Sequence, residues 1–213
     1  MPSPIGHALS GVAIAWTASL GEPRDPAGRT VSDRWLPVYV ALAAAPDLDL
    51  LVHGAHRTAT HSVTAMVLVT IVAAAVTGQV TRLRALRFGG QAPRRASRFG
   101  GQAPRRASRF DRQARWRVAL LCGISYGSHL LLDWLAADNY PPRGIQLLWP
   151  FSGRWFISDV DLFRQTARQE FLTAPIIRQN LIAVAQECLI LLPILALTWW
   201  ARRRQRQRGS QYV

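Results

Sequence analysis

Long apolar runs separated by clusters of arginine are the feature that most limits how this chain can fold. The apolar runs cover approximately residues 5–20, 35–52, 62–80, 118–137 and 181–200. A membrane-spanning helix needs roughly 20 apolar residues, with about 17 to 25 usual. The last three runs reach that length, whereas the first is short and the second carries two aspartates near its end. The pattern predicts an all-α integral membrane bundle of four to five spans.

Arginine alone carries the positive charge, because the formal net charge is +14 and the chain contains no lysine. Twelve arginines and one acid lie in residues 82–117, and five arginines lie in residues 202–208. Cytoplasmic loops of inner membrane proteins are enriched in basic residues, so both clusters are expected on the cytoplasmic side of a bacterial plasma membrane. Alternation of the five runs then places the N-terminus and residues 138–180 on the outer side.

Composition also excludes several kinds of chemistry. Without lysine the chain cannot form a lysine Schiff base. Its two cysteines, Cys122 and Cys188, both lie in apolar runs, where small buried hydrophobic side chains are expected. A disulfide framework and a cysteine-based zinc site are therefore not available.

The chain divides into four regions. Residues 1–81 hold the first helices, residues 118–200 hold the later helices and an aromatic segment expected at the membrane interface, and residues 201–213 form a basic tail. Residues 82–117 contain the repeat RFGGQAPRRAS twice, at 87–97 and 98–108. Because this composition is rich in Gly, Pro, Arg and Ser, the loop is expected to be disordered. We expect it to contact anionic lipid head groups; a tether for a regulator or a nucleic acid is the alternative.

Histidines and aspartates gather at one level of the predicted bundle. None of the five histidines lies in the basic loop or the tail. With the orientation set by arginine, side chains from four of the apolar runs meet near the outer side: His7, Asp47, Asp49, His53, His56, His61, His129 and Asp133. His129 and Asp133 are four residues apart, so they share one face of a helix.

Carboxylates in a membrane need compensation. An aspartate near the middle of a span costs ~2.5–3.5 kcal/mol on insertion scales, so a metal ion, a water-filled cavity or pairing with Arg57 must offset that cost. Imidazole and carboxylate are ordinary ligands of zinc, manganese and iron, and such an ion lowers the pKa of bound water. The sequence therefore predicts a metal site. A proton or ion pathway through the membrane is the alternative, because intramembrane acids are also expected there.

Five motifs in order resemble a known family. They are GHALSG at residues 6–11, PDLD at 46–49, HRTATHS at 56–62, SHLLLDW at 128–134 and GIQLLWPFS at 144–152. Together they are similar to the YdjM-type, membrane-bound metal-dependent hydrolases of bacteria and archaea. The resemblance covers nearly the whole chain except the arginine repeat and the tail. Thr58 stands where the family has glycine.

The resemblance implies a metal-dependent hydrolase. It implies that the metal ligands are His7, Asp47, His61, His129 and Asp133. Asp49, His56 and Arg57 match positions that support catalysis or bind an anion. We expect zinc, with manganese or iron as alternatives, and an ester, possibly a phosphoester, of a membrane lipid or another membrane-associated substrate.

Overall fold

The computed structural model describes residues 1–213 except 26, 52–55, 89–102, 168–171 and 211–213. The described residues form only helices and coil, apart from two isolated β-bridges in the coil after α4. The α-helices and 3-10 helices are α1 (Pro4–Ala18), α2 (Val31–Ala44), η1 (Ala45–Leu51), η2 (Ala59–His61), α3 (Val63–Phe88), α4 (Ala103–Trp134) and α5 (Ala174–Ser210). The predicted all-α class is confirmed.

The first two helices begin at side-chain caps that the sequence supplies. Ser3 precedes α1, accepts a hydrogen bond from the backbone N–H of Gly6 at 3.3 Å, and is followed by a proline in the first turn. Thr30 and Asp33 form a reciprocal capping box at the start of α2. Such caps satisfy backbone N–H groups that have no partner inside the helix.

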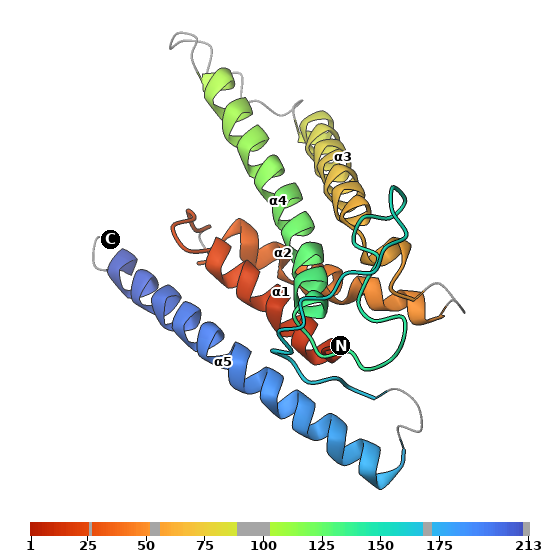
Figure 1. Cartoon of the computed structure of the whole chain (residues 1–213). Coiled ribbons are helices and arrows are strands. Elements are labelled where there is room, and N and C mark those ends of the chain that lie inside the picture. Colours follow the sequence, from red (N-terminus) through yellow and green to blue (C-terminus); the bar gives the residue numbers. More distant parts are fainter. Residues whose placement is uncertain (26, 52–55, 89–102, 168–171, 211–213) are drawn as a thin grey trace.

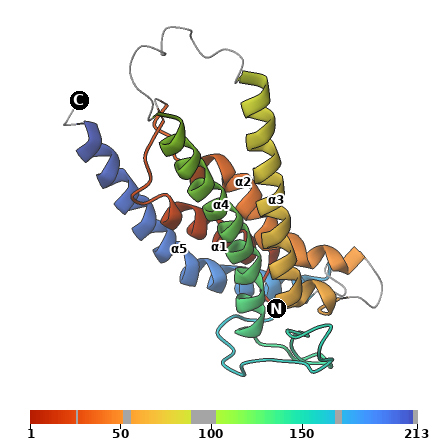
Figure 2. The same cartoon turned by 90° about the horizontal axis from the view of Figure 1, so that it is seen from above.

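Successive helices run in opposite directions. Arg117 in α4 donates to the carbonyl of Ala18 at the end of α1, and Arg202 near the end of α5 pairs with Asp33 at the start of α2. The other ends of α1 and α4 meet at the opposite end of the bundle. Figures 1 and 2 show α5 lying along α1, and α3 beside α4.

Close packing of α3 against α4 depends on two glycines. A Cβ atom at Gly123 would overlap Thr70 Oγ1, and one at Gly127 would lie 2.7 Å from Met66 Sδ. Small residues spaced four apart let helix backbones approach each other, as in membrane helix pairs.

Two helices are long and apolar enough to cross a membrane: Val63–Val80 within α3, and α5 over Ala174–Arg208. Only 6% of the first segment and 22% of the second are buried inside the protein, so their apolar side chains face outward. α1 and α2 have 15 and 14 residues, which is shorter than a usual span. Spans beyond these two remain a prediction.

Helix structure also differs from expectation in two places. The second apolar run leaves the α-helix at Ala44, because Pro46 and the aspartates that follow it lie in the 3-10 segment η1. The basic loop expected to be disordered over 82–117 is helical at both flanks, up to Phe88 and from Ala103. Arginine and alanine favour helix, so both neighbouring helices extend into it; residues 89–102 lie outside the described residues.

Candidate metal centre

Five buried side chains from four separate segments meet at one end of the bundle. His7 comes from α1, Asp47 from η1, His61 from η2, and His129 and Asp133 from α4. The three imidazoles have no exposed surface, Asp133 is 2% exposed and Asp47 is 9% exposed. The structure thus places together all five residues that the sequence and its resemblance indicate as ligands.

Asp133 lies at the middle of this group. Its Oδ2 atom is 3.2 Å from His129 Nε2 and 3.3 Å from His61 Nε2, and its Oδ1 atom is 3.4 Å from His7 Nε2. Asp47 Oδ1 lies 3.9 Å from His129 Nε2 and 4.0 Å from His61 Nε2. The rings of His7 and His129 are stacked, with centroids 3.7 Å apart.

Two of the imidazoles are oriented by contacts of their Nδ1 atoms, on the side of the ring away from Asp133. His129 Nδ1 lies 2.8 Å from the carbonyl oxygen of Ala43, and His61 Nδ1 lies 3.0 Å from Asp49 Oδ2. Both partners are acceptors, so each Nδ1 carries the proton and donates it, which leaves the lone pair on Nε2. The two Nε2 atoms are 3.1 Å apart. Two lone pairs this close, next to a carboxylate, favour a cation.

The donor set fits a divalent metal. Two ligands each about 2.0–2.1 Å from one tetrahedral zinc ion lie roughly 3.3 Å apart, which matches the separations of Asp133 Oδ2 from the two imidazoles. Both oxygens of Asp133 and both nitrogens of His7 are buried without a hydrogen bond, although buried polar atoms in proteins are generally satisfied. Three groups of ligand atoms lie within 4.8 Å of one another: His7 with Asp47 and His129, Asp47 with His56 and His61, and His61 with His129 and Asp133.

Asp49 organises the residues beside this group. Its Oδ1 atom is 2.7 Å from His56 Nδ1, and its Oδ2 atom accepts from Thr60 Oγ1 at 2.5 Å and from the backbone N–H of Arg57 at 3.0 Å. Together with His61, four groups therefore converge on one carboxylate. Contacts of this kind fix the orientation and tautomer of metal-ligating histidines.

These contacts shift the pKa values of Asp49 and His61. Burial opposes ionisation of Asp49, but its hydrogen bonds with His56, His61 and Thr60 hold its pKa well below the usual range. Burial also disfavours a charged His61, but the adjacent carboxylates of Asp133 and Asp49 outweigh burial and raise its pKa to about 9. A raised pKa is expected for an imidazole between two negative charges.

Arg57 is bound on both its backbone and its side chain. Its guanidinium forms an ion pair with Asp138, and its φ of 64° is in the left-handed region. Thr58, where the resemblance places a glycine, has a negative φ of −102° and a ψ of −110°. The left-handed residue is Arg57 itself, held by its hydrogen bond to Asp49.

Two residues at the site were not predicted as functional. Thr60 donates a hydrogen bond to Asp49. Its place in the HRTATHS motif, directly before His61, is the sequence feature that could have indicated this role. Asp138 lies in the coil after α4, where nothing in the sequence distinguishes an acid bound to Arg57 from one in solvent. Among the other histidines, His56 is partly exposed, with 25% of its side chain accessible; His53 lies outside the described residues.

Comparison with models of protein families identifies a match over most of the chain. The family model described as YdjM inner membrane protein matches residues 1–206. No curated protein and no solved structure matches the chain. The matched range includes all the residues of the candidate metal centre, the first candidate membrane helix, and the second candidate membrane helix up to residue 206.

Proposed function

Because the chain belongs to the YdjM inner membrane protein family, we propose that it is a membrane-bound, metal-dependent hydrolase. One observation carries the proposal: the ligand atoms of three histidines and one aspartate face one another, buried, at 3.1–3.4 Å. Lone pairs on neighbouring ligand atoms repel each other, and a metal cation bound between them would remove this repulsion.

His7, Asp47, His61, His129 and Asp133 would hold the ion. Their imidazole and carboxylate donors suit zinc, and manganese or iron as alternatives. When bound, such an ion supplies the acidity that turns water into a nucleophile near neutral pH. Asp47 belongs to two of the ligand groups, and so do His61 and His129, so the set has enough donors for one ion or for two that share ligands.

His56, oriented by Asp49, would act as the general acid or base of the reaction. Asp49 accepts from His56 Nδ1 at 2.7 Å, which fixes the orientation of the ring. Of the histidines described at the site, His56 is the one with exposed surface, so a substrate can reach it. A positioned imidazole of this kind typically contributes about 10²–10⁴-fold to a reaction.

Arg57 would stabilise negative charge on the substrate. Asp138 binds one end of its guanidinium, and its Nε atom is buried without a hydrogen bond. That N–H group is a charge-assisted donor for an oxyanion. A carboxylic or phosphoric ester fits this role, because hydrolysis of either develops negative charge on oxygen.

A membrane-associated ester is the proposed substrate. The centre lies directly before α3, which starts at Val63 and exposes an apolar surface. Exposed aromatics, including Trp149 and Phe151, lie in the coil that follows α4, and such residues are enriched at membrane interfaces. An amphiphile at that interface would have its ester near the level of the centre.

Metal-dependent hydrolysis tests the proposal. Protein purified in detergent would be stripped with chelator, reloaded with zinc or manganese, and assayed on a phospholipid and on a generic phosphodiester. We expect activity only after reloading, lost in Asp133→Asn and retained in Asp159→Asn, which changes an exposed carboxylate. Equal activity in these two variants, or no hydrolysis of either substrate after reloading, would contradict it.

A further inference from the structure

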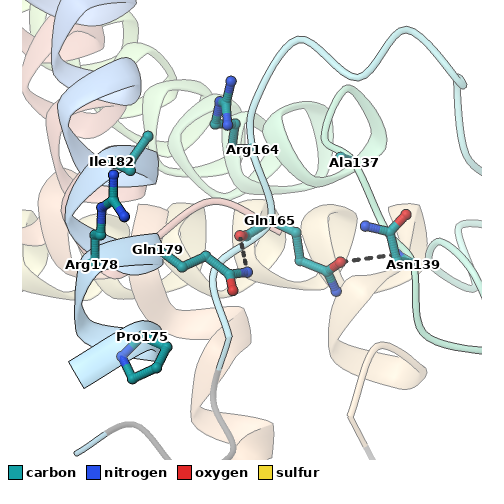
Figure 3. Close-up of a pocket in the computed structure, with 8 residues that line it drawn as sticks. All are labelled: Ala137, Asn139, Arg164, Gln165, Pro175, Arg178, Gln179 and Ile182. Atoms are coloured by element: carbon teal, nitrogen blue, oxygen red, sulfur yellow. Dashed lines mark hydrogen bonds between the residues drawn. The ribbon is translucent and has the colours of Figure 1, made fainter. Parts of the chain in front are cut away.

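A second site lies at the start of α5, outside the metal centre. A cavity of about 480 Å³ opens there between α5 and the coil after α4. Figure 3 shows Arg178, Gln179 and Ile182 on α5, with Gln165 and Asn139 on the opposite side and Arg164 beside them. This end of α5 is the one farther from the arginine-rich tail.

The cavity is positively charged. Arg164 and Arg178 both line it, and both are exposed. No carboxylate lines it in the part of the chain that the structure describes, and neither guanidinium has an ion pair or a hydrogen bond among those residues. Two unpaired arginines on one concave surface attract an anion, and guanidinium groups bind phosphate oxygens with paired N–H donors.

The wall opposite α5 is held in place. Gln165 is 9% exposed; its Nε2 donates to Asp138 Oδ1 at 3.3 Å, and its Oε1 accepts from the backbone N–H of Asn139 at 3.0 Å. Its backbone carbonyl accepts from Gln179 Nε2 at 3.5 Å, which joins the wall to α5 (Figure 3). A ligand therefore meets a preformed surface and need order only the two arginine side chains.

The same cavity adjoins an apolar surface. Ile182 lies one helical turn after Arg178 and is 44% exposed, its neighbour Leu181 is 65% exposed, and farther along α5 Leu189 is 76% exposed. These side chains belong to a helix that meets the length and composition of a membrane span. A ligand with a phosphate in the cavity thus has lipid-facing helix directly beside it.

We propose that this cavity binds an anionic phospholipid, with its phosphate between Arg164 and Arg178 and its acyl chains along α5. A lipid satisfies both the unpaired charges and the adjoining apolar surface, whereas a soluble phosphate ester satisfies only the charges. The site does not depend on a metal at the centre described above.

Lipid retention tests the proposal. Protein in mild detergent would be titrated with phosphatidylglycerol, phosphatidylcholine or glycerol phosphate, and bound molecules would be counted by native mass spectrometry. Wild-type protein is expected to retain phosphatidylglycerol in preference to the other two. The double variant R164Q/R178Q should bind it about tenfold more weakly or worse.

The matched control is R154Q/R208Q, which removes the same charge from two exposed arginines outside the cavity. It should bind phosphatidylglycerol like wild type. Equal loss in both double variants would reduce the effect to general charge attraction and overturn the site. Equal retention of phosphatidylcholine, or equally strong binding of glycerol phosphate, would overturn an anionic lipid as its ligand. Metal content should stay the same in both variants, which separates this result from the test of the metal centre.

Discussion

His61 Nε2 and His129 Nε2 face each other at 3.1 Å, and each ring has its other nitrogen bound to an oxygen acceptor. A proton or a cation between the two nitrogens relieves the repulsion of their lone pairs, and the carboxylates beside His61 raise its pKa to about 9. A divalent ion can replace that proton and contact both lone pairs at once. The chemistry of the site follows from this pair.

Metal content should depend on α4. The double variant H129A/D133A removes two of the converging ligands, so bound metal should fall by roughly tenfold or more. Elemental analysis of detergent-purified protein measures it, with Asp159→Asn as the control for loss of a carboxylate. Equal metal in wild type and H129A/D133A would remove the ligand assignment.

Asp49→Asn should weaken the site without removing a ligand assigned here. The amide no longer balances the charge of His61. Its oxygen can replace only one of the two carboxylate oxygens, and the NH2 group at the other position cannot accept the hydrogen bonds that the carboxylate accepts there. Loss of such a supporting carboxylate typically costs about 10–100-fold in metal affinity. Competition with a chromophoric chelator measures the affinity. An affinity equal to that of wild type would show that Asp49 does not orient His61.

Metal binding should strengthen as pH rises towards 9. In the ion-free protein the pKa of His61 is about 9, above its unfolded value of about 6.5. Its protonated form therefore stabilises the ion-free fold fully below pH of about 6.5, and this contribution is lost as pH rises through about 9. Because only neutral imidazole binds metal, the ion must displace this proton at lower pH. Calorimetry in buffers of different ionisation enthalpy should detect proton release near neutrality; a metal affinity independent of pH over this range would contradict it.

Gly6→Ala should destabilise the fold. A Cβ atom there would lie 2.6 Å from Glu187 Oε2, and Glu187 is fully buried with Ser3 donating to it from both its backbone N–H and its hydroxyl. Overpacking of this kind costs about 1–3 kcal/mol. The midpoint of thermal unfolding in detergent should fall, and adding Glu187→Asp, which shortens the acid, should restore part of it.

The control for that variant is Gly153→Ala, because among the described residues, apart from its two chain neighbours, no atom lies within 4 Å of its Cβ position. It should unfold at the wild-type temperature. An unchanged midpoint in Gly6→Ala would mean that α1 can shift away from α5 at little cost.

Deleting one copy of the repeat, residues 98–108, should leave the metal centre intact. α3 starts two residues after His61 and has 26 residues, so its far end is about 39 Å from the centre. Elemental analysis of the shortened protein should give the wild-type metal content. The hydrolase should also keep its activity, whereas a protein that works by binding a regulator or nucleic acid through this loop would keep its metal and lose its function.

The position of the candidate site could be predicted from the distribution of arginine along the sequence. The arginine clusters fixed the direction of each apolar run, and those directions brought His7, His61 and His129 to one end, as the structure has them. Periodicity could not reveal the 3-10 segment at Ala45–Leu51, because its geometry depends on a proline and on tertiary contacts. Nor could it reveal the ion pair between Arg57 and Asp138, which are 81 positions apart in the chain.

The order of the ligands along the chain has a consequence for biogenesis. His7 is synthesised before the other candidate ligands, and its partners on α4, His129 and Asp133, are synthesised last among them. Glu187, which fastens the start of α1, emerges later still. A ribosome-bound intermediate that stops before α4 therefore lacks His129 and Asp133, and capture of the proposed ion would be a late step of maturation, after α4 has packed against the other helices.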